Sequence, residues 1–258
     1  CMNMERWLPL YERIIRHLSI AEVDDLHASR MLSHLLSSNP GLADSFETLL
    51  ELEGRIMGRP CFIFGSGPSL EGSMSGIGKD SIPGVCVIAA DGATSYLIGE
   101  GILPDVIVSD MDGGIEDQME CVKRGSILIL HAHGDNTKEI SQVVPQLEGM
   151  VIGSTQIDPL KAPGLINFGG FTDGDRAAHI AASLGARSIV LFGFDYEEAV
   201  GKMVGRIILL HPHIPDVFLI LEHRGKRMGI PFGPSHLGDH TVLLQCGYDG
   251  GKARSVLV

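Results

Sequence analysis

The sequence predicts a doubly wound, mostly parallel, Rossmann-like α/β sheet that is preceded by an N-terminal helical extension. Three observations predict this fold. Short apolar runs recur after residue 59, segments of helical character lie between them, and polar motifs follow where the runs end. Buried parallel strands form continuous apolar runs, and strands that alternate with helices favour a parallel sheet.

Residues 1–55 form the expected N-terminal helical extension. Apolar residues recur at helical spacing between Leu8 and Leu50, and Asn39, Pro40 and Gly41 predict a break. Charged residues interrupt every turn, so this region lacks the apolar run of a signal peptide, and we expect a cytoplasmic protein. The extension is expected to serve packing or homodimer formation rather than chemistry.

Residues 56–202 form the predicted Rossmann-like catalytic domain. The expected strands are residues 61–64, 85–90, 106–108, 127–130, 150–152 and 189–192, each too short for a helix. The expected helices are residues 93–100, 114–124, 138–147 and 173–184. Ligands of such sheets bind at the carboxyl ends of the strands, so the polar residues that follow the strands are the candidate site.

Residues 203–258 form a C-terminal segment without clear periodicity. Its five histidines stand at irregular spacing among Gly and Pro, which favours scattered surface and loop positions over a metal site. They are His211, His213, His223, His236 and His240.

Composition excludes several classes of function. The net charge of −12 and the lack of clustered Lys and Arg argue against nucleic-acid binding, so we expect small-molecule partners. No apolar run reaches about 18 residues, which argues against a membrane span. Five cysteines without CxxC spacing argue against disulfides and a cysteine zinc site, and we expect reduced, mostly buried thiols.

A glycine-rich turn follows the first expected strand. It consists of Gly65, Ser66, Gly67, Pro68 and Ser69, and it lacks the lysine of a P-loop. Without side chains, the backbone N–H groups of such a turn can approach a phosphate or a nucleotide. A bare strand-to-helix turn remains the alternative.

Three aspartates follow the next two strands. Asp91 ends one strand, and Asp110 and Asp112 follow the other, where an extended chain places their carboxylates on one side about 7 Å apart. Few carboxylates together with water and phosphate oxygens suit Mg²⁺, so we predict a magnesium site at these three residues. A solvated Asp-rich turn is the structural alternative.

The run from His131 to Asn136 permits two interpretations. The pattern HxHxD begins the metal-binding run of a class of zinc hydrolases, but Asn136 stands where that class needs another histidine. We therefore expect His133, Asp135 and Asn136 to contact substrate or phosphate, and His131 to be a core residue. Thr155 and Gln156, which follow the next expected strand, join the nucleotide contacts.

The last motif begins an Ala-rich helix. Thr172 and Asp175 have the spacing of a capping box, which explains both without a function. Near this helix N-terminus, Arg176 is expected to grip a phosphate, and Asp173 to orient a hydroxyl or a metal-bound water.

Taken together, these motifs resemble the archaeal 6-hydroxymethyl-7,8-dihydropterin pyrophosphokinase family. Their order and spacing agree across about residues 60–196, at residues 65–70, 90–93, 104–113, 133–136 and 169–176. The segments around Asp91 and Asp110 also resemble the catalytic half of thiamine pyrophosphokinases. The C-terminal fifth departs from the family, for which we expect a polar loop and a Lys-rich closing helix after Asp195.

The resemblance implies a reaction and a set of roles. A pyrophosphoryl group passes from the cosubstrate ATP to the hydroxyl of the pterin alcohol and AMP is released, with Mg²⁺ neutralising the triphosphate. It implies metal and phosphate work for Asp91, Asp110 and Asp112, and phosphate or nucleotide contact for the residue 65–69 loop. It implies substrate orientation for the motifs at residues 133–136 and 172–176, with Thr172 among the cofactor contacts. Catalysis is assigned to Asp110, Asp112, Asp173 and Arg176.

Three other functions remain open from the sequence. One is a thiamine-pyrophosphokinase-like enzyme that acts on another alcohol. Another is a nucleotide-sugar glycosyltransferase, since some flagellin-modifying enzymes share a similar Gly-Pro-Ser-Leu loop. The last is a non-catalytic nucleotide- or pterin-binding protein, because a fold does not fix a function.

Overall fold

The computed structural model describes residues 4–75 and 82–194, with only the backbone at Arg6. Beyond residue 194 it describes the backbone of five strands. These are β7 (Met203–Ile208), β8 (Val217–His223), β9 (Lys226–Phe232), β10 (Val242–Asp249) and β11 (Lys252–Leu257). Asp195 and the histidines at 211, 213, 236 and 240 lie outside the described residues, so the expectations for them stay predictions.

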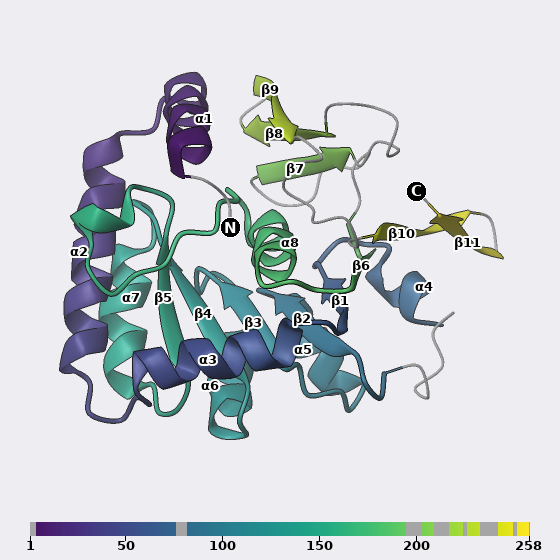
Figure 1. Cartoon of the computed structure of the whole chain (residues 1–258), viewed down its shortest axis with the longest axis horizontal. Helices are drawn as coiled ribbons and strands as arrows, with labels where there is room; N and C mark the ends of the chain where they lie inside the picture. The colour runs from purple at the N-terminus through teal and green to yellow at the C-terminus, as the bar shows by residue number, and fades with distance from the viewer. Residues whose placement is uncertain are drawn as a thin grey trace.

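A parallel sheet forms the centre of the molecule (Figure 1). Its strand order is β11-β10-β6-β1-β2-β3-β4-β5, and the first six strands of the chain are all parallel. They are β1 (Pro60–Phe64), β2 (Cys86–Ala90), β3 (Val106–Ser109), β4 (Ile127–Ala132), β5 (Val151–Thr155) and β6 (Ser188–Phe192). β10 pairs parallel with β6, and β11 pairs antiparallel with β10. The predicted mostly parallel sheet is confirmed.

Helices cover both faces of this sheet. α3 (Ser45–Ile56) and α8 (Asp173–Ser183) pack on the face that carries Ile63, Ile88 and Ile129. The other face carries α4 (Leu70–Ser75), α5 (Ala93–Gly99), α6 (Ile115–Lys123) and α7 (Thr137–Val143). Each fully buried Ile side chain contributes about 1.5–3 kcal/mol by leaving water, so the continuous apolar strands account for the doubly wound arrangement.

The helix after β4 is shorter than expected. α7 ends at Val143, and a 3₁₀ turn, η2 (Val144–Gln146), takes its place where a single helix to residue 147 was predicted. Pro145 lies inside this turn, and it cannot donate the backbone hydrogen bond that an α-helix needs there.

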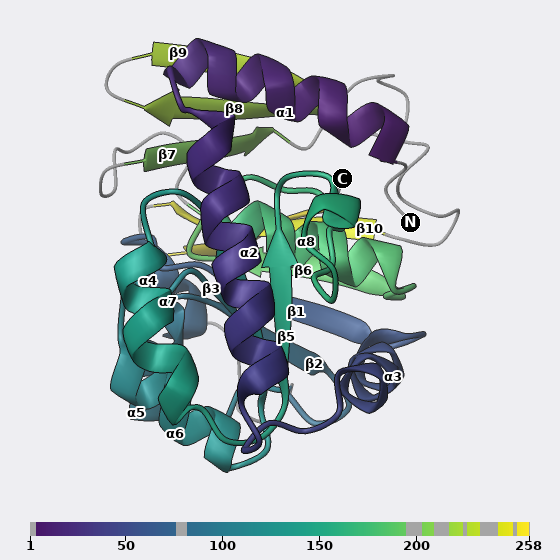
Figure 2. The same ribbon diagram turned by 90° about the vertical axis from the view of Figure 1, so that its left-hand side faces the viewer.

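The N-terminal extension consists of three helices, α1 (Met4–Leu18), α2 (Glu22–Ser38) and α3. The predicted break at Asn39 separates α2 from α3, and a second break, which was not predicted, lies at Ser19 with φ 61°. α2 runs along α7 and β5, and α1 crosses its upper end (Figures 1 and 2). Asp44 caps α3 by accepting the N–H groups of Phe46 and Glu47.

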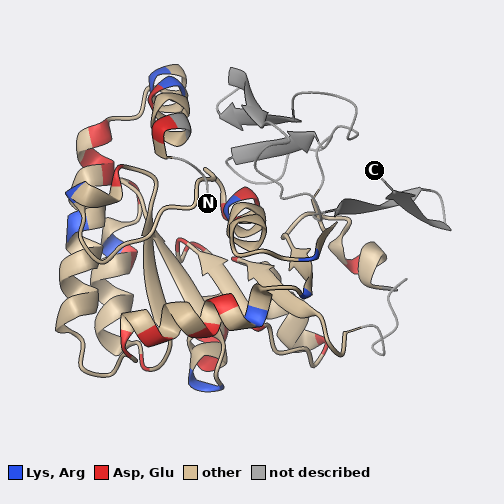
Figure 3. Cartoon of the chain, in the orientation of Figure 1, with Lys and Arg blue, Asp and Glu red and all other residues tan. Residues whose placement is uncertain are grey.

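Strands β7–β9 form a second sheet, which is antiparallel in the order β7-β8-β9. The described part of the C-terminal segment is therefore composed of strands, in contrast to the closing helix that the resemblance implies. Acidic residues outnumber basic residues along α2 and α3, whereas α1 carries both signs (Figure 3). Within the described part of the chain, no helix combines the length and apolarity that crossing a membrane requires.

Candidate active site

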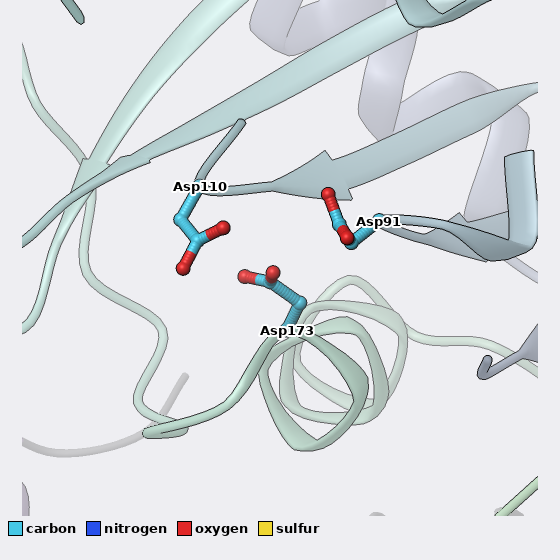
Figure 4. A group of neighbouring side chains, drawn as sticks. All are labelled: Asp91, Asp110 and Asp173. Carbon is cyan, nitrogen blue, oxygen red and sulfur yellow. The ribbon is translucent and has the colours of Figure 1, made fainter. Parts of the chain in front are cut away.

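Three carboxylates meet at the carboxyl edge of the sheet. Asp91 follows β2, Asp110 follows β3, and Asp173 is the first residue of α8. One oxygen of each carboxylate lies within 4.8 Å of the other two, and the side chains point toward one another (Figure 4). Residues that are far apart in the sequence thus form one acidic cluster, which we define as Asp91, Asp110 and Asp173.

Two polar side chains hold Asp91 in the acidic cluster. Ser109 Oγ donates to Asp91 Oδ1 over 2.8 Å, and Gln118 Nε2 donates to the same oxygen over 3.1 Å. Asp91 itself adopts a left-handed backbone with φ 43°, which is uncommon for a non-glycine residue. A Cβ at Gly113 would lie 2.5 Å from Asp91 Oδ2. The site therefore depends on Gln118 and on the glycine at 113, neither of which was predicted from the sequence as a site residue.

His133 fixes the orientation of Asp110. Its Nε2 lies 2.9 Å from Asp110 Oδ2, and the backbone N–H of Asp135 donates to its Nδ1 over 3.3 Å. Nδ1 is thus an acceptor, and the ring proton sits on Nε2. The amide of Asn136 donates to the Asp110 carbonyl over 2.9 Å and to the His131 carbonyl over 2.7 Å. This loop therefore positions Asp110 through both its side chain and its backbone.

Burial would raise the pKa of Asp110, but its neighbours outweigh that effect. The hydrogen bond from His133, followed by the charge of Arg176, holds the pKa of this carboxyl below its usual value. Asp110 is thus ready to act as an anion.

Arg176 lies below the acidic cluster and faces protein groups. It is 3% exposed, and its Nη1 contacts Asp173 Oδ1 over 3.1 Å. Its Nη2 donates to His131 Nε2 over 2.9 Å, and to the carbonyls of Gly170 and Phe171. In this arrangement the guanidinium orients Asp173 and His131, and a grip on a phosphate would require it to leave these partners.

His131 is a neutral core residue, as predicted from the sequence. Arg176 donates to its Nε2, so the ring proton sits on Nδ1 and is shared with Ser154 Oγ at 3.0 Å. Burial, and then the charge of Arg176, lower its pKa well below the ordinary value. Because both ring nitrogens are engaged, His131 is poorly suited to the zinc ligation of the HxHxD alternative.

Asp112 stands beside the acidic cluster and is exposed. Partial burial of its carboxyl, its hydrogen bond to Asp91 and the negative charge of Asp110 raise its pKa to about 7. Burial, and then the charge of Asp110, also raise the pKa of Asp173 well above the usual range, against the opposing effect of Arg176. Crowded carboxylates that resist ionisation are a set of hard oxygen donors, and a divalent cation such as Mg²⁺ fits them.

The glycine-rich turn lies next to Asp91. A Cβ at Gly92 would be 3.2 Å from Ser66 Oγ, and Ser66 Oγ donates to the Ala90 carbonyl over 3.4 Å. Gly65 donates its N–H to Phe192, and Gly67 to Gly193. The structure brings this loop to the acidic cluster, but these two N–H groups already serve the junction with β6.

The remaining predicted contacts have different surroundings. Thr155 and Gln156 are 2% and 3% exposed and bond to groups of the N-terminal helices, so a nucleotide does not reach them in this arrangement. Thr172 donates its N–H and hydroxyl to Asp175, as the capping box predicted. Asp135 is exposed near the acidic cluster.

Residues 33–200 match a family model described as "6-hydroxymethylpterin diphosphokinase MptE-like". The chain belongs to this family. A 6-hydroxymethyl-7,8-dihydropterin pyrophosphokinase of Pyrococcus furiosus is 43% identical over 78% of this chain and 81% of its own length.

Two further relatives bear the same name. The protein of Methanocaldococcus jannaschii is 37% identical over 76% of this chain and 80% of its own. The protein of Methanothermobacter thermautotrophicus is 38% identical over 78% and 82%. A solved Maf glycosyltransferase of Magnetospirillum magneticum is also similar, with 20% identity over 67% of this chain and 30% of that chain, but at a TM-score of 0.40 it supports no functional conclusion.

Proposed function

We propose that the chain transfers a pyrophosphoryl group from ATP to the hydroxyl of 6-hydroxymethyl-7,8-dihydropterin and releases AMP, with Mg²⁺ at the acidic cluster. Membership of the pterin diphosphokinase family supports the reaction. The observation that carries the proposal is the meeting of Asp91, Asp110 and Asp173 within 4.8 Å. Three half-buried carboxylates at this distance repel one another, so the arrangement costs stability and is not explained by folding alone.

The donor set supports a magnesium ion at this place. Asp91, Asp110 and Asp173 would hold it, and when bound it neutralises the charge of the triphosphate. Asp112, which is exposed beside them, is placed to contact its hydration water or the phosphates. The sequence predicted Asp91, Asp110 and Asp112 as ligands, and in this proposal Asp173 takes the place of Asp112 as a direct ligand.

The rest of the machinery aligns the reacting groups. Transfer of a phosphoryl-type group needs little covalent help from a protein, and positioning together with charge stabilisation supplies most of the rate. His133 holds Asp110, Gln118 holds Asp91, and Arg176 holds Asp173, so that each carboxylate is fixed before the nucleotide binds. The residue 65–69 loop borders the same edge and is the proposed place of the phosphates.

Product analysis tests this proposal. The purified protein with ATP, Mg²⁺ and hydroxymethyldihydropterin should form AMP and pterin pyrophosphate in equal amounts, and thiamine in place of the pterin should give no AMP. Asp110→Asn keeps the shape of the side chain and should remove most of the turnover. Formation of ADP instead of AMP, or turnover that persists in EDTA, would refute the proposal.

A further inference from the structure

One buried carboxylate outside the acidic cluster connects the N-terminal helices to the site. Asp25 lies in the first turn of α2 and is 1% exposed. It precedes residues 33–200, the region that the family model matches. Buried carboxylates are costly unless their oxygens are hydrogen-bonded, so the partners of Asp25 indicate what its burial achieves.

Asp25 accepts three hydrogen bonds from three separate parts of the chain. Gly134 N donates to Oδ1 over 2.8 Å, while Gln156 Nε2 and Tyr11 OH donate to Oδ2 over 2.7 Å and 2.5 Å. All three donors are uncharged. An ionised carboxylate is the side chain that accepts at both oxygens and donates nothing, which matches this set of donors.

The bond to Gly134 leads to Asp110. Gly134 directly follows His133, whose Nε2 contacts Asp110 Oδ2 over 2.9 Å. α2 is seated closely on this loop, because a Cβ at Gly134 would lie 2.6 Å from the Cβ of Asp24. Asp25 therefore ties the backbone of the His133 loop to the N-terminal helices.

The bond to Gln156 leads to Asp173. Gln156 follows the end of β5, where Ser154 Oγ shares a hydrogen bond with His131 Nδ1 over 3.0 Å. His131 Nε2 accepts from Arg176, and Arg176 contacts Asp173 Oδ1 over 3.1 Å. A carboxylate only accepts hydrogen bonds, so the NH₂ end of the Gln156 amide faces Asp25. Two of the three carboxylates of the acidic cluster are thus connected to the same buried group.

We propose that Asp25 is a positioning residue of the active site. Through the His133 loop it sets the place of Asp110, and through residues 154–156 at the end of β5, His131 and Arg176 it sets the place of Asp173. Outer partners that orient metal ligands typically account for about 10–100-fold in metal affinity or activity. The N-terminal helices then contribute to cation binding although no side chain of theirs contacts the cation. The inference rests on the proposed function in that it takes the acidic cluster as the cation site.

Cation binding and turnover are measured separately to test this inference. Asp25→Asn keeps the volume but presents an NH₂ group to the three donors, so at least one of the two connections is lost. We expect Mn²⁺ alone, titrated by electron paramagnetic resonance, to bind about 10–100-fold more weakly, and kcat for AMP formation to fall by a similar factor. The ¹⁵N spectrum of His133 should show loss of the single Nε2–H tautomer.

Tyr11→Phe is the matched control. It removes a hydrogen bond from the same carboxylate but lies on neither connection, so it should lower the melting temperature while Mn²⁺ affinity and kcat stay within about twofold of wild type. An equal loss in Tyr11→Phe and Asp25→Asn would mean a general loss of stability and overturn the inference. Unchanged Mn²⁺ affinity and kcat in a folded Asp25→Asn variant would overturn it as well.

A second variant decides the matter if Asp25→Asn does not fold. Gln156→Met breaks only the connection to Asp173, and a loss of Mn²⁺ affinity of about tenfold supports the inference, whereas affinity within twofold of wild type refutes it. The two proposals fail in different ways. Wild-type protein that binds Mn²⁺ but forms no AMP contradicts the proposed function, and the Mn²⁺ comparison among the variants still tests the role of Asp25.

Discussion

Replacement of Arg176 by Met separates two roles for this residue. The sequence suggested a grip on phosphate, whereas the structure buries the guanidinium against Asp173 and His131. Arg176 is 3% exposed and the Asp173 side chain 14%, so loss of the arginine leaves a carboxylate uncompensated in the interior. Breaking such a buried pair costs about 3–5 kcal/mol, and about 2–4 °C are lost per kcal/mol in a chain of this size, which gives a decrease of roughly 6–20 °C in Tm.

Thermal unfolding of the metal-free protein, followed by circular dichroism without nucleotide, measures this decrease. Arg187→Met, which removes an exposed arginine, is the control and should change stability by less than about 0.5 kcal/mol. A Tm of Arg176→Met within about 2 °C of wild type, together with a large rise in KM for ATP, would refute the structural role and favour the phosphate grip.

Three further predictions follow from the acidic cluster. Asp173→Asn should abolish the Tm increase caused by Mn²⁺ and lower turnover on the order of 100-fold, whereas Asp112→Asn should keep most of the Tm increase. If Asp112→Asn instead removes the increase and Asp173→Asn keeps it, Asp112 and not Asp173 is the third ligand. Gly113→Ala brings a Cβ to 2.5 Å from Asp91 Oδ2 and should weaken Mn²⁺ binding about tenfold in calorimetry. Gly54→Ala is the control, because a Cβ there meets open space on α3, and it should raise the free energy of unfolding by about 0.5–1 kcal/mol. The pKa of Asp112 is raised from 3.8 to about 7, so between these pH values the folded metal-free protein holds a proton that the unfolded chain has lost. The urea concentration at the midpoint of unfolding should therefore fall as pH rises over this range. A midpoint that rises instead contradicts the raised pKa of Asp112.

The strands were predictable because each has its own local signal. Residues 106–108 and 127–130 are continuous apolar runs, and they form β3 and β4 with at most two residues of difference at an end. The break after α1 was not predictable in this way, since Ser19 takes a left-handed backbone without a neighbouring glycine or proline. α4 and the division of α7 from η2 also depend on short local turns rather than on periodicity. The proposed division at residues 55 and 202 stays a prediction.

The site was predictable only in part. Strand ends converge in any parallel sheet, so Asp91 and Asp110 were within reach of the sequence, and so was the Asp–Met–Asp turn that contains Asp112. Asp173 was expected near the substrate but not as a partner of those two, because its place depends on how α8 crosses to β6. Gln118 and Asp25 gave no signal, since a polar residue on a helix is ordinarily solvated and only packing shows that it is buried.

The path of the chain through the sheet has a consequence for its biosynthesis. β5 lies at one end of the sheet, and the chain returns across it through α8 before β6 pairs with β1. A nascent polypeptide that has emerged from the ribosome only as far as β5 contains Asp91 and Asp110, which the pairing of β2 with β3 places side by side, but it lacks Asp173. The acidic cluster is therefore incomplete until α8 has been synthesised and has packed on the sheet.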